Sequence, residues 1–263
     1  MSLSSPPGPL SPPSGARTVA VIGAGPAGLF AAEILSGAGL RVTVYDRMAY
    51  PARKFLMAGA SGLNLTHAEP LDTLLTRYGT ARAALEPAIR AFPSEALRAW
   101  AEDLGQNCFT GSSGRVFPTA MKASPLLRAW LARLGARGVP LRARPTWTGW
   151  SGDTLTFDTP DGPVTTRADA TILALGGASW SRLGANGQWT GLFDPEAIAP
   201  FAPSNCGFLP GWSPEHFARW DGAVLSGIAL SFEGRIQRGD LSFTRHGIEG
   251  APIYALSGPL RDA

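Results

Sequence analysis

The sequence predicts an α/β protein that begins with a βαβ unit on a covered parallel sheet. Residues 18–22, Thr-Val-Ala-Val-Ile, form a short apolar run of β type, and residues 41–46 form a second. Such runs are typical of parallel strands that are buried on both faces. The residues between them, 26–36, are rich in Ala and Leu and are followed by Gly37 and Gly39, which predicts a helix with a defined end.

Composition excludes several classes of protein. The 263 residues, 44% of them hydrophobic, suffice for one large or two ordinary globular domains. The formal net charge is +3, but the arginines are scattered along the chain, so nucleic acid is not an expected partner. Cys108 and Cys206 form no Cys-x-x-Cys pair, which excludes a dithiol centre of that kind and a disulfide-dense secreted scaffold.

The N-terminal residues 1–16 are rich in Ser and Pro and lack the basic and apolar segments of a secretory signal. We expect them to form a disordered tail. No run approaches the length of a membrane span, so we expect a cytoplasmic protein without a membrane partner. The three histidines are not at metal-ligand spacing, so we expect no metal site.

Residues 51–66 show no regular period and are predicted to be a long ordered loop, a kind of segment that is often functional. Two helices follow: one capped by Ser94, and one that Ser124-Pro125 opens and that runs to about residue 137. Turn residues then separate four short β runs, which predicts a small antiparallel meander. These runs cover residues 141–144, 146–150, 154–158 and 164–167.

A further apolar run, residues 169–175, predicts another buried strand that ends in Gly176-Gly177. Beyond residue 200 the texture changes to Trp, Pro and Gly between short strand candidates. We therefore expect a domain boundary between residues 197 and 200, with one domain at 17–198 and a second at 199–263.

The glycine-rich turn is the motif that carries chemistry. Gly23-Ala24-Gly25-Pro26-Ala27-Gly28 has the spacing Gly-x-Gly-x-x-Gly between a predicted strand and helix. The first glycine makes the tight turn, the second lets the backbone approach a pyrophosphate, and the third lets the helix pack against the strand. Unpaired N–H groups at the start of the helix then face the phosphates. This pattern predicts a Rossmann-like dinucleotide-binding domain.

Asp46 lies 23 positions after Gly23, at the end of the second strand. An acidic residue at about this distance binds the ribose hydroxyls in such domains. Its charge argues against NADP, although Arg47 and Arg53 nearby weaken that argument. The glycine motif does not separate NAD from FAD. One N-terminal motif, a long insertion and a later strand ending in Gly176-Gly177 favour FAD.

The segment after Asp46 offers further candidate cofactor contacts, beginning with Arg47, and Gly176 and Gly177 are candidates as well. Arg53 and Lys54 could neutralise a pyrophosphate or a ribose phosphate. Gly59 and Gly62 would let the backbone approach an isoalloxazine ring, and Asn64 could both donate to and accept from its polar edge. The alternative interpretation is a solvated basic pair followed by a flexible loop.

The sequence resembles bacterial flavoproteins of the aminoacetone oxidase family, which are related to bile-acid-reductase-like FAD-binding proteins. The segments that carry the resemblance are residues 21–29, 53–59, 62–67, 113–118, 173–183 and 249–262. The resemblance implies a split FAD-binding domain of the two-dinucleotide-binding type, with a substrate domain inserted after Gly176-Gly177. In such families the chain then returns to the FAD domain. We therefore expect this chain to be C-terminally truncated, with residues 199–263 an incomplete inserted domain.

We expect an FAD-dependent oxidoreductase that oxidises a small amine or reduces an activated double bond, with O2 or NAD(P)H as a second substrate. No catalytic residue is predicted, because the flavin supplies the redox chemistry. The main alternative is a truncated, non-catalytic nucleotide-binding module, and a nicotinamide-dependent dehydrogenase is disfavoured by the layout of the chain.

Overall fold

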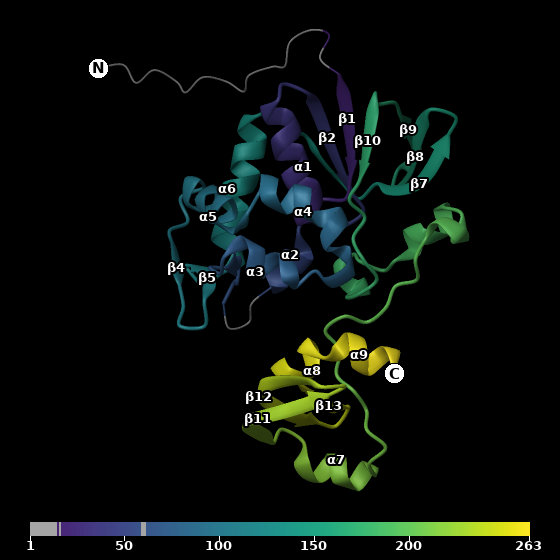
Figure 1. Ribbon diagram of the computed structural model, residues 1–263. Coiled ribbons are helices and arrows are strands. Elements are labelled where there is room, and N and C mark those ends of the chain that lie inside the picture. The colour runs from purple at the N-terminus through teal and green to yellow at the C-terminus, as the bar shows by residue number, and fades with distance from the viewer. Residues whose placement is uncertain (1–14, 16, 59–61) are drawn as a thin grey trace. The chain divides into compact units, whose positions relative to one another are not determined.

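The computed structural model describes residues 15, 17–58 and 62–263, and the chain divides into two compact units at residues 198 and 199 (Figure 1). Of the predicted tail, residues 1–16, only Gly15 lies among the described residues. The two units are described separately below.

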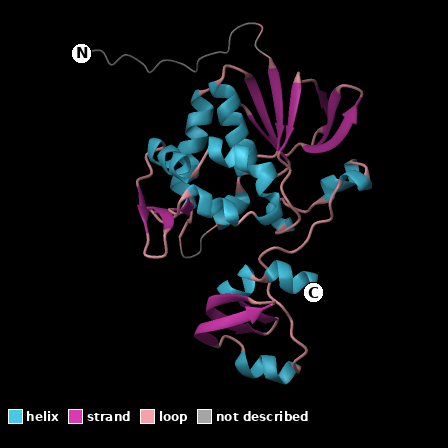
Figure 2. Cartoon of the chain, viewed as in Figure 1, coloured by secondary structure: helices cyan, strands magenta, loops and turns pink. Residues whose placement is uncertain are grey.

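The first unit is built on a parallel sheet in the strand order β10-β1-β2-β6, in which β1 pairs with both β2 and β10 (Figure 2). Helix α1 (Pro26–Gly37) connects β1 to β2 as the crossover that parallel strands require. The predicted fold class, a Rossmann-like α/β domain, is thereby confirmed. The strands of this sheet are β1 (Thr18–Ile22), β2 (Arg41–Asp46), β6 (Leu141–Ala143) and β10 (Ala170–Leu173).

Both faces of this sheet are covered, and β1 shows how. Val19 and Val21 pack in a core with the helices, whereas Ala20 and Ile22 pack in a second cluster with the antiparallel meander. Alternate side chains of a strand point to opposite faces, so an uninterrupted apolar run is what a strand between two covering layers needs. The helical layer includes α1, α5 (Ser94–Asp103) and α6 (Ala123–Ala136).

The predicted meander is present, but one of its expected strands belongs elsewhere. Strands β7, β8 and β9 pair in order as an antiparallel sheet. The run predicted at residues 141–144 instead forms β6, which extends the parallel sheet by pairing with β2. Helix α6 precedes β6 and supplies a second crossover, which local turn signals do not reveal. The meander strands are β7 (Thr146–Ser151), β8 (Thr154–Thr159) and β9 (Gly162–Thr166).

The loop predicted at residues 51–66 is wrong in part, because residues 53–57 form the short helix α2 (Arg53–Met57). A small antiparallel sheet in the order β3-β5-β4 is formed further along the chain. The helix expected at Ser94 is α5, but Pro93 is its N-cap, and the Ser94 hydroxyl accepts a hydrogen bond of 2.9 Å from Thr66 instead. The remaining elements here are β3 (Thr66–His67), α3 (Leu71–Thr76), α4 (Arg82–Ala91), β4 (Cys108–Thr110) and β5 (Arg115–Pro118).

Beyond β10 the chain of the first unit makes three short 3₁₀ turns, at Ser181–Leu183, Gln188–Leu192 and Pro195–Ala197. The second unit contains an antiparallel sheet in the order β11-β12-β13. The side chains buried in this unit include Phe217, Leu241, Ile253 and Leu256. Its elements are α7 (Pro214–Trp220), β11 (Val224–Phe232), β12 (Arg235–Thr244), β13 (Gly247–Gly250), α8 (Ala251–Ala255) and α9 (Ser257–Asp262).

Candidate dinucleotide-binding site

The glycine turn joins the carboxyl end of β1 to the first turn of α1. The Gly23 N–H donates to the Tyr45 carbonyl at 2.7 Å, which fastens the turn to β2. Gly25 is the N-cap of α1, and Pro26 occupies the first helical position, where its missing N–H costs nothing. The N-terminus of α1 therefore opens at the carboxyl edge of the sheet, where α/β domains bind ligands.

The three glycines of the motif differ in what surrounds them. Gly23 has a φ of +109°, and a Cβ atom there would collide with the Ala174 carbonyl. A Cβ atom at Gly28 would collide with the Gly23 carbonyl. At Gly25 the φ is −78°, and a Cβ atom would meet nothing within 4 Å. The fold itself thus requires the first and third glycines, whereas the second faces open space, as it would if a pyrophosphate lay against its backbone.

Asp46 lies directly against this turn. Its Oδ2 accepts a hydrogen bond of 2.7 Å from the Ala24 N–H, and its Oδ1 accepts one of 2.8 Å from the Met48 N–H. A carboxylate has about four acceptor positions on its two oxygens, so both oxygens keep capacity for ribose hydroxyls. Asp46 and Ala24 are thus in direct contact in the fold, although 22 positions separate them in the sequence.

Two basic residues of the predicted site, Arg47 and Lys54, have protein partners that the sequence did not indicate. Arg47 Nε donates to the Gly184 carbonyl at 3.0 Å, and Lys54 Nζ lies 3.0 Å from Ser179 Oγ. Both partners belong to residues 176–193, which we call the post-β10 segment. These two bonds tie the post-β10 segment to the end of β2 and to α2.

Helix α2 is itself fastened to the glycine turn. The Ala52 N–H donates to the Ala24 carbonyl at 2.8 Å, and Ala52 adopts a φ of +53°, which is uncommon for a residue other than glycine. Arg53, the first residue of α2, follows directly. The structure therefore places the start of α2, with Arg53 and Lys54, next to the predicted phosphate turn.

The other loop residues are placed differently. Gly62 is buried with a φ of +140°, a backbone conformation that residues with side chains rarely adopt, so the backbone conformation explains its glycine. The neighbouring Leu63 N–H donates to the Met121 carbonyl at 2.9 Å. Asn64 is exposed, and Gly59 lies outside the described residues.

Gly176 and Gly177 follow β10 at the same edge of the sheet as the glycine turn. The Ala174 N–H donates to the Ile22 carbonyl at 2.8 Å, which extends the parallel pairing to the point where both strands end. Gly176 adopts a φ of +74°, and its carbonyl accepts a hydrogen bond of 3.0 Å from Trp189 Nε1. The two glycine sites predicted from distant parts of the sequence thus meet at adjacent strand ends.

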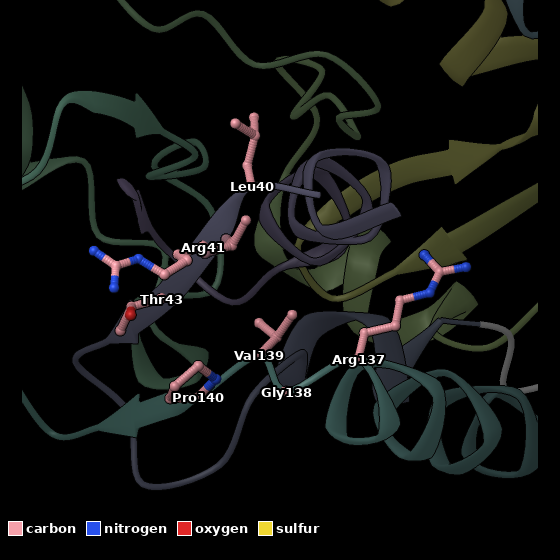
Figure 3. Close-up of a pocket in the computed structure, with 8 residues that line it drawn as sticks. Leu40, Arg41, Thr43, Arg137, Gly138, Val139 and Pro140 are labelled. Carbon is pink, nitrogen blue, oxygen red and sulfur yellow. The ribbon is translucent and has the colours of Figure 1, made fainter. Parts of the chain in front are cut away.

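A surface pocket of about 290 Å³ lies at the opposite edge of the sheet, where β2 and β6 begin (Figure 3). Its lining includes Leu40, Arg41, Val139 and Pro140. Arg41 and Arg137 point away from each other in Figure 3, so the pocket lacks a convergent pair of cations. Because dinucleotides bind at the carboxyl ends of the strands, this pocket is not the candidate site.

Within residues 15, 17–58 and 62–263, no group of three or more His, Cys, Asp or Glu side chains is arranged to hold a metal ion. In the same part of the chain, each helix is too short or too polar to cross a membrane.

The parallel sheet, the glycine turn at the helix N-terminus and the acidic residue at the end of β2 define a dinucleotide-binding Rossmann domain. The chain belongs to the HI0933-like family: residues 17–201 match the HI0933-like protein Rossmann domain, and residues 202–263 match the family's barrel and H2TH domain. This membership supports FAD as the cofactor, as the sequence predicted.

Several solved structures are similar to the chain at low identity. THI4 of Thermovibrio ammonificans is 17% identical, with 61% of this chain and 57% of that chain covered and a TM-score of 0.41. The 3-ketosteroid-delta4-(5alpha)-dehydrogenase of Rhodococcus jostii RHA1 is 16% identical, with coverages of 61% and 46% and a TM-score of 0.44. The OxyS anhydrotetracycline hydroxylase of Streptomyces rimosus is 18% identical, with coverages of 87% and 45% and a TM-score of 0.41.

The chain spans about half the length of these solved structures. No curated protein matches it.

Proposed function

We propose that the glycine turn Gly23–Gly28 holds the ADP half of FAD and that Asp46 binds the adenosine ribose. The observation that carries this proposal is the contrast among the three glycines. The fold needs glycine at positions 23 and 28 for packing, but no contact within the protein requires glycine at position 25, where a Cβ atom would meet nothing within 4 Å. A pyrophosphate against the backbone of Gly25 and Pro26-Ala27 would account for this glycine, because unpaired N–H groups at a helix N-terminus bind phosphates.

The flavin half of FAD would then extend from the turn toward Gly176-Gly177. The parallel pairing of β1 with β10, which brings these glycines to the next strand end, supports this direction. Arg53 and Lys54, at the start of α2, are the basic side chains that we propose to face the phosphates. Gly59, Gly62 and Asn64 remain candidate contacts of the isoalloxazine ring.

For the whole protein we propose a reaction of the aminoacetone oxidase type, in which a small amine is oxidised, or the reduction of an activated double bond. The sequence resemblance, above all residues 53–67, supports this substrate class. The bound flavin supplies the two-electron chemistry, with O2 or NAD(P)H as the second substrate. The protein's own residues bind and orient the cofactor, and we propose residues 199–263 as part of the domain that holds the substrate.

The test is a calorimetric titration of the purified chain with FAD, with ADP and with NAD⁺. We expect FAD to bind more tightly than ADP, because both halves of FAD are held, and NAD⁺ to bind weakly. An FAD-loaded sample is then mixed with aminoacetone without air, and bleaching of the flavin absorbance reports electron transfer. Binding of NAD⁺ in preference to FAD would point to a nicotinamide-dependent enzyme, and binding without bleaching by amines or NAD(P)H would favour a non-catalytic nucleotide-binding module.

A further inference from the structure

An aromatic cluster connects the Gly176-Gly177 turn to the meander on the far face of the sheet. The ring of Trp189 packs edge-on against Phe193, with 5.8 Å between the ring centroids and 88° between the planes. Phe193 in turn packs against Trp147 of β7 at 6.1 Å and Trp150 at 6.0 Å. Trp147 is buried in the core that the meander shares with β1. Trp189 is therefore attached to a rigid part of the fold.

The indole nitrogen of Trp189 forms a hydrogen bond with the peptide group between Gly176 and Gly177. Its Nε1–H donates to the Gly176 carbonyl at 3.0 Å. A trans peptide is planar, with its C=O and N–H directed to opposite sides. Fixing the Gly176 carbonyl therefore fixes the Gly177 N–H, which points away from Trp189. A residue with a φ of +74° that lacks a side chain has wide conformational freedom, so this peptide needs an external restraint.

The Gly177 N–H has no hydrogen-bond partner among the residues that the structure describes. Gly177 is half-buried, and it follows the strand that lies beside the glycine turn. An unpaired backbone donor at the carboxyl end of a parallel strand is available to an oxygen atom of a ligand at that edge.

The same meander also supports the first glycine turn. Phe157 of β8 stacks on Tyr45 of β2 with 4.7 Å between ring centroids and 26° between planes. The Tyr45 carbonyl accepts the Gly23 N–H. The meander is thus connected through aromatic contacts to both turns at the carboxyl edge, and Trp189 is the link to the second turn.

We propose that Trp189 is a positioning residue, which orients the Gly176-Gly177 peptide so that the Gly177 N–H is presented to the flavin half of FAD. This inference rests on the proposed function, since it requires FAD at the glycine turn. Trp189 need not touch the cofactor; it acts through the Gly176 carbonyl and its packing on Phe193.

The experiment compares Trp189→Phe with Trp150→Phe. Trp189→Phe keeps an aromatic ring against Phe193 but removes the donor to Gly176. Trp150→Phe makes the same chemical change in the same cluster, at a side chain that is 45% exposed. Calorimetry on the purified chain gives the dissociation constants for FAD and for ADP. Hydrogen–deuterium exchange of the apoprotein reports the mobility of residues 174–187.

We expect Trp189→Phe to weaken FAD binding about fivefold to tenfold, the effect of one lost hydrogen bond. Its ADP affinity should stay unchanged, because ADP contacts only the first turn, and exchange over residues 174–187 should rise. Trp150→Phe should change none of these quantities. An equal loss of FAD and ADP affinity would show a general structural defect and overturn the proposal.

The experiment distinguishes a failure of the proposed function from a failure of the positioning role of Trp189. If the parent chain binds ADP but gains no affinity from the flavin half, the assignment of that half to Gly176-Gly177 is wrong, and the role of Trp189 in binding FAD falls with it. If the parent binds FAD more tightly than ADP but Trp189→Phe does so too, and exchange over residues 174–187 is unchanged, the proposed function stands and the positioning role is overturned.

Discussion

The carboxylate of Asp46 and the backbone N–H of Ala24 are joined by a hydrogen bond of 2.7 Å between the end of β2 and the middle of the glycine turn. Asp46 therefore stabilises the glycine turn even without a ligand, and the N–H groups of this turn are the ones that would bind the phosphates. The predicted ribose contact uses the remaining acceptor capacity of the same carboxylate. Substitutions at position 46 test both the stabilisation of the turn and the contact with the ribose. Comparing two replacement residues separates these two roles.

Asp46→Ala removes both tasks, so we expect a loss of about 1.5–3 kcal/mol in the free energy of unfolding and a loss of similar size in FAD affinity. Asp46→Asn keeps an oxygen that can accept from Ala24 but loses the charge, so the free energy of unfolding should fall by only about 1 kcal/mol. Urea unfolding of the apoprotein and calorimetric titration with FAD measure the two effects. Unchanged FAD affinity in Asp46→Ala would show that this carboxylate does not bind the ribose.

Gly25→Val should abolish FAD binding and leave the apoprotein folded. The Cβ atom would enter the open space that we assign to the pyrophosphate, and the φ of −78° is acceptable to any residue. Gly28→Ala is the matched contrast, because its single added methyl group would collide with the Gly23 carbonyl and disturb the turn itself. Circular dichroism and FAD titration of both variants decide the matter. A Gly25→Val protein that still binds FAD normally would place the phosphates elsewhere.

The parts of the fold that the sequence predicted well are those with local signals. The βαβ unit follows from two apolar runs and the glycine spacing, and the meander follows from its turn residues. Strand β6 was assigned to the wrong sheet, because its three residues carry no periodicity that distinguishes parallel from antiparallel pairing. Helix α2 was missed because its N-cap is Ala52, whose positive φ accompanies a hydrogen bond to Ala24, and a local stretch of sequence does not reveal that contact.

In the candidate site, too, features with a local sequence signal were predicted, and contacts between distant residues were not. Glycine spacing and Asp46 were recognisable because their chemistry depends on separations of at most 23 residues. The partners of Arg47 and Lys54 are 137 and 125 residues away, so no local pattern could indicate them. A tryptophan shortly after the Gly-Gly turn was a usable signal, since a buried or half-buried indole usually finds a hydrogen-bond partner.

Glu33 is a buried carboxylate that joins three helices of the first unit. Its oxygens accept hydrogen bonds of 3.0 Å from Arg133 of α6 and from the Trp100 indole of α5. Glu33→Gln keeps the shape but removes the charge, so we expect the free energy of unfolding to fall by about 1.5–3 kcal/mol. Glu102→Gln, which breaks an exposed pair with Arg98, should cost less than about 0.5 kcal/mol. If urea unfolding showed that both variants lose the same free energy of unfolding, Glu33 would not be the important link between the helices.

The last prediction concerns how Arg47 contributes to FAD binding. Its Nε bonds to the Gly184 carbonyl from a half-buried position, so we expect Arg47 to act by holding the post-β10 segment. Lys54 makes an exposed contact with the Ser179 hydroxyl, so its ammonium group can turn to the phosphates of FAD. Arg47→Met should lower FAD affinity by about 1.5–3 kcal/mol, the scale for a hydrogen bond with a charged partner.

Salt distinguishes the two roles. Screening weakens the attraction between an exposed cation and a phosphate, but it has little effect on a short bond to a carbonyl. Across a series of NaCl concentrations, the affinity lost in Lys54→Met should therefore shrink, whereas the affinity lost in Arg47→Met should stay constant. Hydrogen–deuterium exchange over residues 176–193 should rise in Arg47→Met alone. If the loss in Arg47→Met also shrinks with salt and exchange is unchanged, then Arg47 contacts the phosphates directly, and its bond to Gly184 is not what FAD binding depends on.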